Sequence, residues 1–156
     1  LDNMENAVTF ENLDLYEVVQ KCSDNLRINA EKHGVTFQMR GEPTMVRANR
    51  EMMIELVNNL CDNAIRYNDK NGWVCVTVGM ENEKGVLTVE DNGIGIPKEH
   101  QDRIFERFYR VDKSRSKQTG GTGLGLAIVK HIVLLHDASL ELFSEAGKGT
   151  KITVTF

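Results

Sequence analysis

The sequence predicts a two-layer α/β sandwich formed by a single domain. Three segments show the spacing of amphipathic helices, and short runs rich in β-branched and aromatic residues lie between and after them. The last run alternates cleanly, because Ile152, Val154 and Phe156 fall on one side and the intervening lysine and threonines on the other. That alternation is typical of a sheet with one packed and one solvent-facing side. A chain of 156 residues can bury a core without disulfides or a structural metal.

The first half of the chain predicts two helices and two short strands. Apolar residues recur at helical spacing from Leu13 to about His33, where a following glycine is a typical helix end. A second helix is expected to begin near Asn49, whose side chain suits an N-cap. Turn residues between the helices separate two strand candidates, at 35–39 and 45–46.

The second half predicts a hairpin, one helix and two final strands. The β-rich runs 73–78 and 86–89 are separated by a short polar turn, which indicates a hairpin. Apolar spacing predicts a third helix over 124–136. The last two strands are expected at 139–143 and 150–156, joined by a glycine turn.

One face of the second helix carries side chains that suit magnesium and phosphate. Four polar residues recur there at spacings of four, four and three: Glu55, Asn59, Asn63 and Arg66. The opposite stripe is apolar and consists of Met53, Val57, Leu60 and Ala64. Amide oxygens suit a hard cation and a guanidinium suits phosphate, so this face favours Mg²⁺-ATP. A solvated face is the alternative, but asparagine is a weaker helix former than lysine, glutamate or glutamine, which favours the functional interpretation.

A glycine-dense segment, 120–129, opens the third helix. Gly121, Gly123 and Gly125 alternate there, so the backbone can approach an oxyanion without an intervening Cβ. The N–H groups of the first helical turn also favour negative charge. The spacing matches neither the dinucleotide fingerprint nor the phosphate loop, so the segment indicates phosphate binding without identifying the ligand.

An aspartate lies between the predicted strand at 86–89 and a Gly-x-Gly loop. Asp91 is followed by Gly93 and Gly95 in this loop. A plain turn is one interpretation. The other is a base pocket, in which the carboxylate accepts a hydrogen bond from an exocyclic amine and the glycines leave room for a flat ring.

The long connection 97–120 is the third unusual segment. Its second half, 111–120, contains almost no apolar residue, and loops of this length are usually lids or disordered segments. We expect Phe105 and Phe108 to anchor it in apolar surroundings. The cations expected to approach terminal phosphates or a partner domain are Arg107, Arg110, Lys113 and Arg115.

Composition excludes several classes of function. The formal net charge of −4 comes without a basic block, so no nucleic-acid partner is expected. The three cysteines Cys22, Cys61 and Cys75 lie in apolar contexts without metal-site spacing, which predicts reduced core residues. No stretch reaches the roughly 18 to 20 apolar residues that span a bilayer, so no membrane contact by this domain is expected.

Four motifs in this order resemble those of the ATP-binding catalytic domain of bacterial sensor histidine kinases, part of the wider GHKL ATPase group that includes gyrase and mismatch-repair proteins. Segment 59–67 resembles the asparagine box, 91–95 the first glycine box, 105–110 the phenylalanine box and 121–125 the second glycine box. The resemblance covers Leu13 to Phe156. It implies a Bergerat fold, in the α+β class: a mixed, mostly antiparallel sheet of about five strands with three main helices on one face.

The resemblance also implies roles for individual residues. Asn63 would coordinate Mg²⁺, Asn59 and Arg66 would contact the phosphates, and Asp91 would read the adenine amino group. The full set of nucleotide-binding residues that it implies is Asn59, Asn63, Arg66, Tyr67, Asp91, Gly93, Gly95, Ile96, Phe105, Gly121, Thr122, Gly123, Leu124 and Gly125. The residues implied to act in catalysis are Asn59, Arg66, Arg107 and Arg110.

The resemblance implies a protein-histidine kinase that divides its work between domains. The chain begins without a methionine, and residues 1–12 are expected to be the remnant of a linker from a helical dimerisation domain. Residues 13–156 would bind Mg²⁺-ATP and transfer the γ-phosphoryl group to a histidine of that domain, for relay to an aspartate of a response regulator. Among the four histidines, only His136 is followed by an acidic residue, Asp137, and this pair lies where the third helix of the family ends, so the acceptor histidine is expected outside this sequence. We expect a monomeric, cytoplasmic domain of a membrane-anchored sensor.

Other interpretations stay open within the same fold. A gyrase-type ATPase needs a general base four residues before the magnesium asparagine, but that position is Asn59, whose amide cannot take a proton at neutral pH. An ATP-sensing domain that regulates a partner is a further alternative. An anti-sigma-factor serine kinase shares the fold and would be expected to lack the aromatic box at 105–110.

Overall fold

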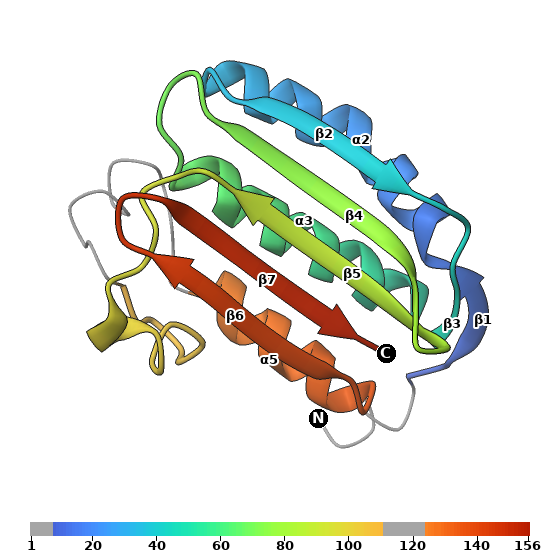
Figure 1. The fold of residues 1–156 in the computed structure, drawn as a ribbon. Helices are drawn as coiled ribbons and strands as arrows, with labels where there is room; N and C mark the ends of the chain where they lie inside the picture. Colours follow the sequence, from blue (N-terminus) through green and yellow to red (C-terminus); the bar gives the residue numbers. More distant parts are fainter. Residues whose placement is uncertain (1–7, 111–123) are drawn as a thin grey trace.

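The computed structural model describes residues 8–110 and 124–156 and shows two layers, a sheet covered on one side by helices (Figure 1). The elements in chain order are β1 (Glu11–Asp14), α2 (Leu15–Lys32), β2 (Thr36–Gly41), β3 (Met45–Ala48), α3 (Arg50–Arg66), β4 (Trp73–Glu81), β5 (Lys84–Asp91), the 3-10 helix η1 (Lys98–His100), α5 (Gly125–Leu135), β6 (Ser139–Glu145) and β7 (Gly149–Thr155). The predicted α+β sandwich is confirmed.

The main sheet has five strands in the order β2-β4-β5-β7-β6. Only β2 and β4 pair in parallel, and the other neighbours are antiparallel, as predicted. The hairpin between β4 and β5 turns at Asn82 and Glu83, which both adopt positive φ. All three long helices lie on the same side of this sheet (Figure 1).

A second sheet of two strands, β1 and β3, was not expected from the sequence. Glu11 pairs with Ala48 and Asp14 with Met45, so the strand includes two residues that the sequence assigns to the linker. Helix α2 consequently begins at Leu15 and not at Leu13. Asp14 is its N-cap, because its Oδ1 accepts from the Tyr16 N–H at 3.0 Å and also from the Thr44 N–H at 2.8 Å.

Helix α3 begins where its sequence predicts. The Oδ1 of Asn49 accepts from the Met52 N–H at 2.9 Å, which satisfies one of the free donors of the first turn. From that start the apolar stripe Met53, Val57, Leu60 and Ala64 is buried, as expected. The stripe packs into the core between helices and sheet, so the opposite polar face is left for other contacts.

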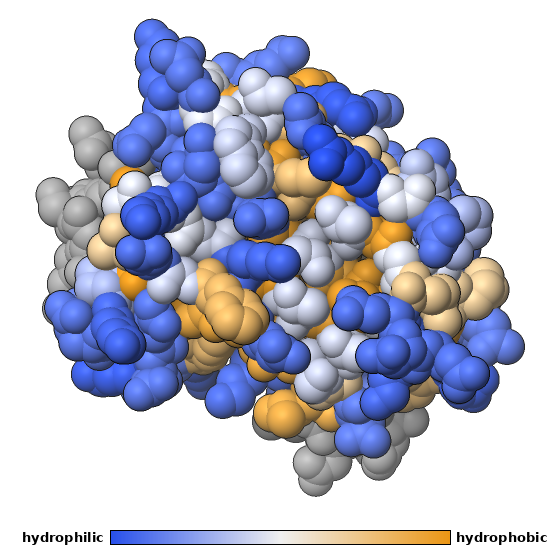
Figure 2. Space-filling model, in the orientation of Figure 1, coloured by the Kyte–Doolittle hydropathy of each residue, from blue (hydrophilic) through white to orange (hydrophobic). Residues whose placement is uncertain are grey.

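The face of the sheet away from the helices is open to solvent. Figure 2 shows several pale and apolar residues toward its centre and mostly hydrophilic residues around its rim. Cys75 lies on this face and is only partly buried, because it alternates with the buried Val74 and Val76. The expectation of a core cysteine is therefore wrong for Cys75, whereas Cys22 and Cys61 are buried.

Across the described ranges, no helix combines the length and the apolar character needed to cross a membrane.

Candidate nucleotide-binding site

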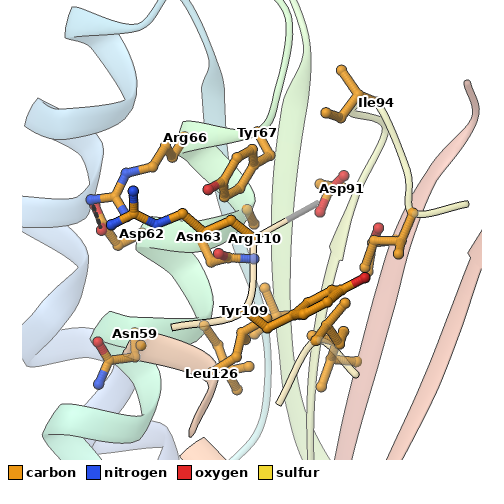
Figure 3. A pocket seen from close by; sticks show the side chains of 18 of the residues that line it. Asn59, Asp62, Asn63, Arg66, Tyr67, Asp91, Ile94, Tyr109, Arg110 and Leu126 are labelled. Atoms are coloured by element: carbon orange, nitrogen blue, oxygen red, sulfur yellow. Dashed lines mark hydrogen bonds and ion pairs between the residues drawn. The ribbon is translucent and has the colours of Figure 1, made fainter. Parts of the chain in front are cut away.

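A cavity of about 330 Å³ opens between the helices and one end of the sheet (Figure 3). This volume falls in the range of small-molecule sites. Its lining comes from α3, β5 and the loop that follows it, the start of α5, and β7. The lining residues are Asn59, Leu60, Asp62, Asn63, Ala64, Arg66, Tyr67, Val89, Asp91, Ile94, Gly95, Ile96, Ile104, Tyr109, Arg110, Leu124, Gly125, Leu126, Ile128, Thr150 and Ile152.

Helix α3 contributes the polar side of the cavity. Asn59, Asn63 and Arg66 all line it, together with Tyr67 at the helix end, as the sequence predicts. Glu55, the first residue of the predicted polar face, is exposed and lies outside the lining. The periodicity of the helix therefore identifies three of its four candidate residues as cavity residues.

Asp62 is a cavity residue that the sequence analysis does not identify. Its Oδ2 accepts from an Arg66 guanidinium nitrogen at 2.8 Å, an ion pair drawn as a dashed line in Figure 3. Its Oδ1 accepts from Asn29 Nδ2 of α2 at 3.0 Å. Asp62 and Arg66 are spaced i, i+4 on the helix, and this spacing is the signal in the sequence that indicates their ion pair. The carboxylate holds the guanidinium at the cavity rim and ties α3 to α2.

Asp91 faces the cavity from the sheet, opposite Asn63 (Figure 3). Its Oδ1 accepts from the Gly93 N–H at 2.8 Å. Burial raises the pKa of this carboxyl to about 6, although hydrogen bonds from the backbone of Gly93 and Thr150 oppose the shift. Asp91 is therefore ionised at neutral pH and is a hydrogen-bond acceptor inside a largely apolar pocket.

The glycines after Asp91 let the backbone of the loop pack closely. A Cβ at Gly93 would lie 2.5 Å from the carbonyl oxygen of Tyr67, and one at Gly95 would lie 2.0 Å from that of Glu145. Gly95 also has a φ of +69°. Gly95 lines the cavity, whereas Gly93 is buried behind it and acts through the position of the loop.

The aromatic box is arranged differently from the prediction. Phe108 is 61% exposed, so the expectation that it anchors the connection in apolar surroundings is wrong. Ile104 is the buried residue of this segment, at 6% exposure, and it lines the cavity with Tyr109 and Arg110. Neither Phe105 nor Arg107 is part of the lining, and the Arg107 guanidinium lies over the Phe108 ring at 5.4 Å.

The start of α5 closes the cavity beside α3. Leu124 and Gly125 both line it, and a Cβ at Gly125 would lie 3.5 Å from Asn59 Oδ1. The described end of the second glycine box thus lies against the face of α3 that carries Asn59. The other predicted residues of this box and of the lid lie outside the described residues: Gly121, Thr122, Gly123, Lys113 and Arg115.

The donor set in the cavity fits magnesium that is shared with a phosphate ligand. Two asparagine amides line the cavity one turn apart on α3, at Asn59 and Asn63. The Asp62 carboxylate also lines it, but its two oxygens are already paired with Asn29 and Arg66. Among the described residues, no group of three or more His, Cys, Asp or Glu side chains could hold a metal alone. Mg²⁺ typically takes one or two protein oxygens and completes its shell with phosphate and water.

Comparison with known proteins connects this geometry to one family. Residues 48–156 match the family model described as histidine kinase-, DNA gyrase B- and HSP90-like ATPase. The sensor histidine kinase YkoH of Bacillus subtilis is 37% identical over 149 residues, which cover 96% of this chain and 32% of that protein. The sensor-like histidine kinase SenX3 of Mycolicibacterium smegmatis is 34% identical over 157 residues, covering 99% of this chain and 41% of that protein.

Solved structures agree with the sequence comparison. The mycobacterial sensor histidine kinase MprB superposes with a TM-score of 0.81 at 28% identity, over 95% of this chain and 97% of the solved one. The chain spans about a third of the length of the first curated relative that it matches and two fifths of SenX3. It belongs to the histidine kinase-, DNA gyrase B- and HSP90-like ATPases, as a catalytic ATP-binding domain of the sensor histidine kinase type.

Proposed function

We propose that this chain binds Mg²⁺-ATP in the cavity and transfers the γ-phosphoryl group to a histidine on a separate helical dimerisation domain. The observation that carries the proposal is the arrangement of Asn63 and Asp91 on opposite sides of one cavity. The α3 side offers amides and a guanidinium for phosphates, and the sheet side offers the partly buried Asp91 carboxylate as an acceptor for a base. A nucleoside triphosphate needs both.

Each cavity residue then has a role that follows from its chemistry. The ionised Asp91 accepts a hydrogen bond from the exocyclic amine of adenine, and the apolar Ile94 and Ile104 exclude water around the ring. The guanidinium groups of Arg66 and Arg110 attract the phosphates at the cavity rim. Asn59 and Asn63 supply amide groups to the α3 side of the cavity, and Asn63 is the proposed magnesium ligand.

Phosphoryl transfer in such a site depends on positioning and charge. Magnesium, when bound, neutralises charge on the phosphate oxygens. The residues of this chain hold the triphosphate so that the bond from the bridging oxygen to the γ-phosphorus breaks as a nitrogen of the acceptor imidazole forms the new N–P bond. ADP leaves, and no group of this chain becomes covalently modified.

The kinase is favoured over an ATP hydrolase of the gyrase type. Hydrolysis needs a base that activates water, and the position expected for it holds Asn59. Glu55, one turn earlier on α3, is exposed and does not line the cavity. The described cavity therefore lacks a glutamate beside the asparagines.

The proposal extends to partners and location. The acceptor domain would pass the phosphoryl group to an aspartate of a response regulator. Because the relatives are named as sensor kinases, the chain would be a cytoplasmic domain of a protein anchored in the membrane. The chain by itself would be a monomer. No nucleic-acid partner is proposed.

Transfer of labelled phosphate tests the proposed activity. The chain is mixed with the histidine-bearing helical domain of the same protein, Mg²⁺ and ATP labelled at the γ-position. We expect an acid-labile, base-stable label on the helical domain, and loss of that label with Asn63→Ala. Release of free phosphate at the same rate with or without the helical domain, and no labelled protein, would contradict the kinase and favour the hydrolase.

A further inference from the structure

The hydroxyl group of Ser144, on β6, joins two segments that line the cavity. Its Oγ accepts from the Ile96 N–H at 2.8 Å and donates to the Gly149 carbonyl oxygen at 3.0 Å. It also lies 2.8 Å from the hydroxyl of Thr150. A serine hydroxyl has one proton and two lone pairs, so all three contacts are satisfied together when Thr150 donates. Ile96 and Thr150 line the cavity, whereas Ser144 itself stands behind it.

The side chain of Gln101 forms a second connection between the same segments. Its Nε2 donates to the Ile96 carbonyl oxygen at 2.9 Å and to the Ser144 carbonyl oxygen at 3.0 Å. Both polar groups of the Ile96 backbone are thereby held by side chains outside the lining. A residue held through N–H and C=O together has little freedom to shift along the cavity wall.

Backbone contacts extend this connection to Asp91. The Gly147 N–H donates to the Ile94 carbonyl oxygen at 2.7 Å, and Asp91 is paired with Thr150 across β5 and β7. The backbone of Thr150 also hydrogen-bonds to the Asp91 carboxylate. The turn between β6 and β7 and the first residues of β7 therefore fix the loop at 94–96 relative to the Asp91 carboxylate.

We propose that Ser144 and Gln101 are positioning residues that set the discrimination of the cavity for adenine. The inference rests on the proposed function, in which Asp91 reads the amine of the base. A buried hydrogen-bonding site discriminates strongly between ligands that do and do not match its donors and acceptors, provided that its groups are held in place. Ser144 and Gln101 supply that restraint through Ile96 and Thr150, without touching the nucleotide themselves.

Binding of two nucleotides to the 156-residue chain tests the inference. Dissociation constants with Mg²⁺ are measured for ATP and for inosine triphosphate, which has a carbonyl where adenine has its amine. We expect Ser144→Ala to lower the preference for ATP about tenfold, mainly through weaker ATP binding, because it removes the partner of the partly buried Ile96 N–H. Ser144→Thr should restore the preference, and Gln101→Ala should lower it in the same direction.

The matched control is Ser139→Ala, which makes the same change at an exposed position at the other end of β6. It should leave both dissociation constants unchanged. Equal weakening of both nucleotides, or an unchanged preference in both Ser144→Ala and Gln101→Ala, would overturn the inference. Failure of the wild-type chain to bind ATP would overturn the proposed function, and this inference with it. If the wild-type chain prefers ATP over inosine triphosphate and both variants keep that preference, the inference is overturned but the proposed function stands.

Discussion

Asp91 connects ionisation of a single carboxyl group to nucleotide binding. Its pKa of about 6 means that it is largely protonated at pH 5. A carboxylic acid is a weaker acceptor than a carboxylate, so protonation weakens the proposed hydrogen bond from the adenine amine. We expect ATP affinity to fall about tenfold between pH 7.5 and pH 5, relative to the same change in Asp91→Asn. Calorimetry on both chains measures it, and the variant corrects for protonation of the phosphates. If the ATP affinity of the wild type and of Asp91→Asn changes in parallel with pH, Asp91 does not accept a hydrogen bond from the nucleotide.

The same carboxyl group should also change stability with pH. Because its pKa is raised from 3.8 to about 6, the folded chain binds more protons than the unfolded chain between these values. The contribution to stability is therefore full below about pH 3.8 and is lost as the pH rises through 6. Relative to Asp91→Asn, the wild-type free energy of unfolding should rise by about 2 kcal/mol from pH 7.5 to pH 4. Urea unfolding at the two pH values measures this difference, and an opposite sign would exclude burial as the cause.

Substitutions at two glycines, Gly95 and Gly147, distinguish the cost of a strained backbone conformation from the cost of a steric clash. Gly95 and Gly147 have φ of +69° and +82°, but a Cβ would meet the Glu145 carbonyl oxygen at 2.0 Å only at Gly95, and nothing within 4 Å at Gly147. Gly147→Ala should cost about 1 kcal/mol of unfolding free energy. Gly95→Ala should cost at least about 2 kcal/mol more, because backbone must move. Equal losses in urea unfolding would show that the close approach is unimportant.

The two helices α2 and α3 meet at Asp62, which joins Asn29 and Arg66 at the cavity rim. Asp62→Asn keeps the shape, removes a negative charge beside the expected phosphates and frees the guanidinium. We expect MgATP to bind about threefold more tightly at low salt, and the unfolding free energy to fall by no more than about 1 kcal/mol, because the pair is partly exposed. Calorimetry at two salt concentrations measures the effect.

The control for that change is Glu55→Gln, which removes the same charge from α3 at an exposed position outside the lining. It should alter affinity much less. Weaker binding in Asp62→Asn would show that the carboxylate itself helps to hold the ligand.

At the scale of elements, the sequence predicts those helices and strands whose residues are arranged with a clear local period. Helix α3 was predicted with its cap at Asn49 because apolar period and capping residue agree. Strand β1 was not predicted, because four residues beside a helix show no period, and its pairing with β3 is non-local. The aromatic box shows the same limit, since residue type favours Phe108 as an anchor, whereas tertiary packing buries Ile104.

At the scale of the whole molecule, the cavity combines segments that are far apart in the chain. The polar face of α3 and the carboxylate after β5 were predicted, because each is visible in one short motif. The wall formed by Thr150 and Ile152, and the restraint from Ser144, depend on the pairing of β5 with β7. Motifs predict several of the residues that line the cavity, but the assembled sheet shows what holds them in place.

The central claim is that one Mg²⁺-ATP molecule is bound between α3 and the end of the sheet. Calorimetric titration of the chain with ATP, with and without Mg²⁺, tests it on the wild type, Asn63→Ala and Asp91→Ala. The matched control is Asn58→Ala, an exposed asparagine of α3 outside the lining. The account predicts Mg²⁺-dependent binding that both cavity variants weaken at least about tenfold and that Asn58→Ala leaves intact. Binding that is absent, or that is indifferent to both cavity substitutions, would contradict it.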